Sequence, residues 1–122
     1  MRPYLDFSFL IHLVVLAGER SRLAHETALP FRLPLPISDL HILQVENFIR
    51  HTVLRDPRTR PLMTSAAVRW RNHLSELVYQ TVAIDWCEAS RRAVAANRLA
   101  TNWPGTPLSL LHLGAAQLAT AT

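Results

Sequence analysis

Two acidic residues, Asp6 and Glu46, occupy positions where a fold usually has apolar side chains, which suggests a functional role for their carboxylates. Asp6 follows residues 2–5, which we expect to form a short strand, and precedes an apolar run from Phe7 to Ala17. In open α/β sheets ligands bind at the edge where parallel strands give way to helices. The alternative is that Asp6 caps the following helix, because an acid there accepts free backbone N–H groups and favours the helix dipole.

Glu46 lies in an expected helix whose apolar residues gather on one side. At about 100° per residue, Ile42, Ile49 and Val53 fall on the same side as Glu46. A carboxylate in an apolar stripe is strongly destabilised unless a cation or hydrogen bonds compensate its desolvation. A pair with Arg50, one turn on, would contribute only about 0.2–0.5 kcal/mol. The pattern favours a hard metal ion held by Asp6 and Glu46.

Six arginines fall between residues 50 and 71, opposed there only by Asp56, in a chain of net charge +4. Such a cluster attracts polyanions, and each phosphate neutralised on a single strand contributes about −0.7 to the salt slope. The alternative is a solvated helix face with its connecting loop. The arginines expected to contact RNA or an acidic partner are Arg50, Arg55, Arg58, Arg60, Arg69 and Arg71.

The composition predicts one globular domain over residues 1–122, with 49% hydrophobic and 18% charged residues. A single cysteine, Cys87, excludes an internal disulfide and fits a reducing cytoplasm; we expect it to be a small buried side chain. The apolar run Phe7–Ala17 is shorter than the roughly 20 residues that span a bilayer. It loosely resembles a signal peptide, but the lone Arg2 and the adjacent Asp6 argue against export. We expect a cytoplasmic protein without a membrane partner.

Strands and helices are expected to alternate, which predicts a parallel α/β sheet. Three caps support the helix starts: Ser38, Asp85 and Thr106, the last followed by Pro107. The three tryptophans, Trp70, Trp86 and Trp103, are expected to pack in or near the core. The expected elements are a strand at 2–5, a helix at 8–25, an edge strand at 33–37, helices at 38–53 and 62–79, a strand at 81–84, a helix at 85–101 and a last helix from 106 onward.

Three segments resemble the motifs of PIN domains. Tyr4-Leu5-Asp6-Phe7-Ser8 resembles their opening motif, and Ile37-Ser38-Asp39 with Glu46-Asn47 resembles the second. The segment from Pro107 to Ala116 resembles the third motif. In it, Ser109 stands where the family has an aspartate, and His112 follows one turn later. The resemblance covers nearly the whole chain.

This resemblance implies a PIN-like three-layer α/β fold with a short parallel sheet flanked by helices. We expect the last strand of the family to be absent from this sequence, which ends at Thr122. It further implies a VapC-type toxin: a Mg²⁺- or Mn²⁺-dependent endoribonuclease with RNA as substrate, a small cognate antitoxin as partner, and a homodimer as the usual assembly.

Carried onto this chain, the resemblance makes Asp6 and Glu46 metal ligands and catalytic residues, and Ser8 a hydroxyl that orders the site. Ser109 takes the third catalytic position as a neutral hydroxyl, so the acidic site is incomplete. His112 is interpreted as a packed or capping histidine. Two alternatives stay open: a non-catalytic module that binds RNA or an antitoxin, and a truncated remnant of a toxin gene.

Overall fold

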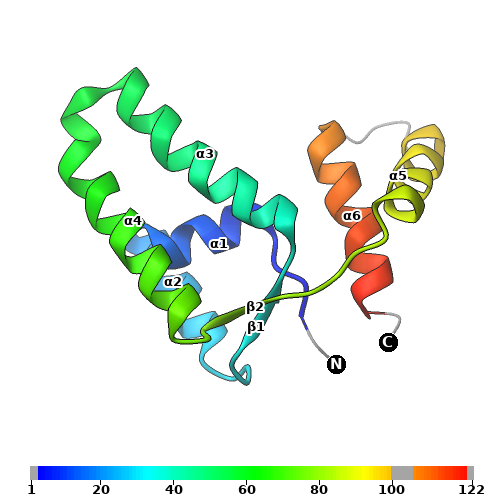
Figure 1. The fold of residues 1–122 in the computed structure, drawn as a ribbon, viewed down its shortest axis with the longest axis horizontal. Helices are drawn as coiled ribbons and strands as arrows, with labels where there is room; N and C mark the ends of the chain where they lie inside the picture. Colours follow the sequence, from blue (N-terminus) through cyan, green and yellow to red (C-terminus); the bar gives the residue numbers. More distant parts are fainter. Residues whose placement is uncertain (1–2, 100–105, 121–122) are drawn as a thin grey trace. The chain divides into compact units, whose positions relative to one another are not determined.

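The computed structural model describes residues 3–99 and 106–120, most of which are helical (Figure 1). These residues fall into two units. The larger unit runs from Leu5 to Thr81, and the smaller combines Tyr4 with the chain from Val82 onward.

The larger unit begins with two short helices where the sequence predicted one. Helix α1 spans Phe7–Val14 and α2 spans Gly18–Ala28. The prediction of a continuous helix is wrong because the chain becomes extended at Val15, and Gly18 has a φ of 77°, a left-handed conformation that favours glycine. The predicted strand at 2–5 is also wrong for its described part, since residues 3–5 form no strand.

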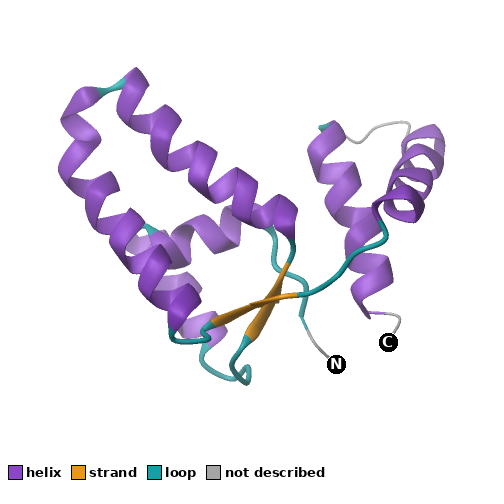
Figure 2. Cartoon of the chain, in the orientation of Figure 1, coloured by secondary structure: helices purple, strands orange, loops and turns teal. Residues whose placement is uncertain are grey.

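Two three-residue strands form a parallel sheet, as predicted, although the second strand shares only Thr81 with the strand expected at 81–84. Strand β1 spans Leu35–Ile37 and β2 spans Tyr79–Thr81, with Leu35 opposite Tyr79 and Ile37 opposite Thr81. Between the strands lie α3 (Asp39–Arg55), the 3₁₀ turn η1 (Pro57–Thr59) and α4 (Arg60–Ser75). Ser38 caps α3 as predicted. The general α/β class is therefore confirmed, with a sheet much smaller than its helices (Figure 2).

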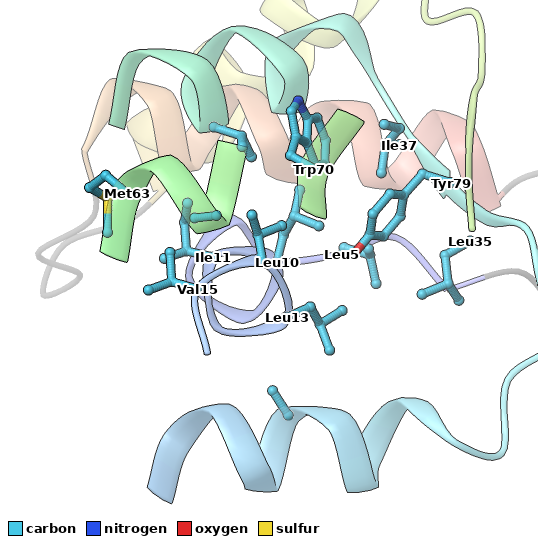
Figure 3. Close-up of a cluster of buried hydrophobic side chains, with 14 residues drawn as sticks. Leu5, Leu10, Ile11, Leu13, Val15, Leu35, Ile37, Met63, Trp70 and Tyr79 are labelled. Atoms are coloured by element: carbon cyan, nitrogen blue, oxygen red, sulfur yellow. The ribbon is translucent and has the colours of Figure 1, made fainter. Parts of the chain in front are cut away.

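The core of the larger unit gathers apolar side chains from its helices and from both strands (Figure 3). All three residues of β1 are buried. Trp70 of α4 is only 3% exposed, and its ring centroid lies 5.4 Å from that of Tyr79 on β2. The prediction that Trp70 belongs to the core is confirmed. Among the other buried residues are Leu10, Leu13 and Val14 of α1, Val45 of α3, and Met63 and Ala66 of α4.

The smaller unit contains a pair of closely packed helices, α5 (Trp86–Leu99) and α6 (Pro107–Thr120). Both predicted caps are confirmed: Asp85 accepts the Glu88 backbone N–H at 3.1 Å, and Thr106 accepts that of Ser109 at 3.2 Å. Cys87 is exposed, so its predicted burial is wrong. It sits in the first turn of α5, while the buried position of that helix is Ala89.

The contact between α5 and α6 leaves no room for a side chain at Gly114. A Cβ atom there would lie 2.3 Å from the carbonyl oxygen of Ala89, and that backbone atom cannot rotate away. The close approach therefore requires glycine.

Gly114→Ala should destabilise the chain by about 1–3 kcal/mol, the usual cost of overpacking. The direction of the change in unfolding free energy distinguishes the two cases, because Gly→Ala inside a helix otherwise stabilises by about 1 kcal/mol. Urea denaturation followed by circular dichroism measures the change. Gln117→Ala, at an exposed position of the same helix, is the control and should leave the midpoint nearly unchanged. A stabilised Gly114→Ala would show that the two helices are not in this close contact.

Candidate functional site

Asp6 lies at the start of α1 and acts as its N-cap. Its side chain is exposed and accepts the backbone N–H of Ser8 at 3.1 Å. The capping alternative is therefore confirmed, and one carboxylate oxygen of Asp6 is already engaged. Ser8 is exposed in the first turn of the helix.

Glu46 is exposed on α3, so the prediction that it shares the apolar stripe is wrong. The helix is rotated so that His41 and Val45 face the core, with Ile42 and Ile49 only partly buried beside them. The desolvation argument for a metal at Glu46 therefore fails, because water solvates this carboxylate.

Ser109 lies in the first turn of α6 and takes part in the cap of that helix. Its Oγ is 3.1 Å from the Thr106 hydroxyl, which also accepts the Ser109 backbone N–H. Ser109 belongs to the smaller unit, whereas Asp6 and Glu46 belong to the larger. Within the described ranges, no group of three or more His, Cys, Asp or Glu side chains is placed to hold a metal ion. Mg²⁺ is usually held in proteins by one or two carboxylates with water in the remaining positions, and of the two predicted carboxylates Asp6 already accepts a backbone N–H.

His41 is the residue that the sequence analysis overlooked. It is completely buried, with Nε2 2.7 Å from the Leu5 carbonyl oxygen and Nδ1 2.9 Å from the Ser38 backbone nitrogen. Since the Ser38 N–H donates to Nδ1, the proton of the neutral ring is on Nε2, which donates to Leu5. Burial lowers the pKa of His41, against smaller opposing effects of the Leu5 carbonyl and Asp6. The available signal was a polar side chain three residues after the Ser38 cap, the spacing of a capping box.

His112 is a packed histidine, as predicted. It is 9% exposed, and its Nδ1 lies 2.6 Å from the Tyr4 hydroxyl within the smaller unit. This short bond holds the N-terminal Tyr4 against α6.

The predicted basic cluster maps onto the hairpin formed by α3, η1 and α4 (Figure 1). Arg69 is partly buried, and its Nη1 donates to the Val14 carbonyl at the end of α1, 2.8 Å away. Arg58 pairs with Asp56 at 3.0 Å, which lowers the pKa of that carboxyl group. Arg50 donates to Asn47 at 3.1 Å.

The remaining three arginines of the cluster, Arg55, Arg60 and Arg71, are exposed and form no hydrogen bond or ion pair through their side chains within the described part of the chain. Arg55 ends α3 and Arg60 begins α4, so both stand at the turn of the hairpin. These guanidinium groups have all their donors available to an incoming anion.

Comparison of the chain with family models, with curated proteins and with solved structures gives no match.

None of the helices in the described ranges combines the length and the apolar character needed to cross a membrane. Trp103 lies outside the described residues.

Asp6→Ala should lower the free energy of unfolding by about 1 kcal/mol in metal-free buffer, because α1 loses its cap. Asp6→Asn should keep most of that stability, since an amide oxygen can cap equally well. Chemical denaturation in the presence of EDTA measures both variants. Glu46→Ala is the exposed control and should stay within about 0.5 kcal/mol of the wild type. An Asp6→Ala protein as stable as the wild type would argue against the capping role.

His41 should make the chain less stable in mild acid. Its folded pKa lies below the ordinary value of 6.5, so the unfolded chain binds the proton more readily. The free energy of unfolding is therefore highest above pH 6.5. It falls as the pH drops below 6.5, by at most about 1.4 kcal/mol per pH unit. His41→Gln should flatten this slope in unfolding free energies measured from pH 8 to pH 5. His51→Gln, on the exposed side of α3, should keep the slope; the same slope in His41→Gln would assign it to other groups.

Proposed function

We propose that this chain is a PIN-like module of the VapC type that binds single-stranded RNA through the arginines of the α3–η1–α4 hairpin without cleaving it. The observation that carries this proposal is the pair Arg55 and Arg60, which flank η1, are exposed and have no acidic partner in the described chain. RNA phosphates would supply the anions that these guanidinium groups lack, with the bidentate geometry that arginine favours.

The position of Arg60 adds to this attraction. It is the first residue of the 16-residue helix α4. A helix N-terminus carries a partial positive charge that favours phosphate. The guanidinium group of Arg60 and this end of α4 therefore act in the same direction on an anion.

The acidic residues support binding without cleavage. Asp6 acts as a helix cap and Glu46 as an exposed surface acid, while Ser109 contributes a neutral hydroxyl to a second cap. In the resembled family the chemistry depends on clustered carboxylates around a hard metal ion, and the described ranges bring no three or more such ligands together. The fold would thus still bind RNA without being able to cleave it.

Arg55→Gln combined with Arg60→Gln should weaken the binding of a fluorescently labelled, mixed-sequence single-stranded RNA. Fluorescence anisotropy over a series of salt concentrations measures the effect. Each lost phosphate contact should reduce the magnitude of the salt slope by roughly 0.7, so the double variant should lose about 1.4. Arg20→Gln with Arg98→Gln removes the same charge from exposed positions outside the cluster and should cost much less.

Equal weakening by both double variants would contradict the proposed interface, because it would show that only net charge matters.

The proposal that the chain does not cleave RNA has a separate test: the same RNA incubated with Mn²⁺ should stay intact with the wild type. Cleavage by the wild type that disappears in Asp6→Asn would overturn the non-catalytic proposal. If Ser109→Asp alone cleaves, the proposal stands and the missing carboxylate explains the inactivity.

A further inference from the structure

Helix α4 contains no acidic residue over its whole length, although it carries three arginines, Arg60, Arg69 and Arg71. The nearest acid before the helix is Asp56, which is already paired with Arg58. In Figure 1, α4 leads back from the hairpin turn beside α3. An anion that reaches the hairpin turn and continues along α4 therefore meets no negative side chain of that helix.

Arg60 and Arg71 lie on the same side of α4, near its two ends. Arg71 comes eleven residues after Arg60, which is about 20° more than three full turns at roughly 3.6 residues per turn. At about 1.5 Å per residue, the two positions are about 16 Å apart along the helix axis. Both side chains are exposed, with no hydrogen bond or ion pair to the described chain. Arg69 is about 160° around the helix from Arg71, where it donates to the Val14 carbonyl oxygen.

The side chains between the two arginines leave this side of the helix open. Thr64 and Ala67 fall within about 40° of Arg60 around the axis. Thr64 is exposed and Ala67 is partly buried, and neither is charged or long enough to stand in the way of a polymer lying on the helix. The Thr64 hydroxyl can also donate a hydrogen bond to a phosphate oxygen. This side of α4 thus has a guanidinium group near each end and a small, neutral surface between them.

We infer that the RNA bound by this chain is an unpaired stretch of about six nucleotides, which lies along α4 from the hairpin turn to Arg71. The inference rests on the proposed binding of RNA at the hairpin turn by Arg55 and Arg60. A strand with stacked bases advances about 3.4 Å per phosphate, as in a duplex, so about 16 Å corresponds to about five steps and six phosphates. Arg71 is then a further phosphate contact, which fixes the direction of the strand on the protein.

The test measures how binding depends on RNA length, using labelled, unstructured oligonucleotides of three to twelve nucleotides and fluorescence anisotropy at several salt concentrations. For the wild type, the magnitude of the salt slope should increase up to about six nucleotides and stay constant beyond that length. In Arg71→Gln the constant value should be lower by roughly 0.7 and should be reached with a shorter oligonucleotide, because only the hairpin turn holds the strand. Arg20→Gln removes the same charge from an exposed position of α2 and should follow the wild-type curve.

Thr64→Glu tests the path between the two arginines, because it places a negative charge beside the inferred position of the strand. At low salt it should weaken the binding of the twelve-nucleotide RNA about threefold or more, the effect of a like charge roughly 6 Å from a phosphate in water. Gln117→Glu adds the same charge at an exposed position of α6 and should leave the affinity nearly unchanged. Thermal melts followed by circular dichroism check that each variant is folded; should one not fold, the wild-type length series decides.

The outcomes separate this inference from the function on which it rests. If Arg71→Gln and Thr64→Glu bind RNA like the wild type while Arg55→Gln with Arg60→Gln weakens binding, the path along α4 is wrong and the proposed function stands. A wild-type salt slope that keeps increasing well beyond six nucleotides would likewise overturn the inferred length. Absence of RNA binding by the wild type would overturn both.

Discussion

The hydrogen bonds of the buried His41 ring are the constraint on which the larger unit depends. One ring joins the Leu5 carbonyl, just before α1, to the Ser38 backbone N–H, where β1 ends and α3 begins. Leu5 is 5% exposed and Ser38 is fully buried, so water cannot replace His41 at either group. Each would otherwise be a buried, unsatisfied polar group costing about 1–3 kcal/mol. His41 therefore fixes the entry of α1 and the register of α3 together.

Local features of this fold could be predicted from the sequence, and features set by packing could not. The caps at Ser38, Asp85 and Thr106 involve a side chain and a backbone group three residues away, so the sequence alone specifies them. The rotation of α3 depends on which residue meets α1 and α4. Leu43 and Leu54 count as apolar in any pattern, yet they are 65% and 72% exposed. The predicted stripe followed Ile42, Ile49 and Val53, which are only partly buried, whereas the buried positions of α3 are His41 and Val45.

The candidate acidic site shows why a motif can indicate the right place and leave its role open. An acid directly before a helix suits a metal site at a sheet edge and also suits an N-cap, because both roles require the carboxylate at the same backbone position. Asp6 and Ser109 both take part in caps in the structure. The two roles differ only in whether further metal ligands lie close to the acid. Which side chains lie close together is decided by the folded chain, and three short motifs cannot specify it.

The arginine cluster separates by burial into structural and available charges. Arg69 is partly desolvated, and a desolvated guanidinium group needs an acceptor, which the Val14 carbonyl provides. Arg55 and Arg60 are solvated at the hairpin turn, where water satisfies their donors and folding requires no partner. Exposed like charges close in sequence repel one another and add nothing to the core. An incoming polyanion would remove that repulsion and release counterions, so the same residues that do least for stability have the most to contribute to binding.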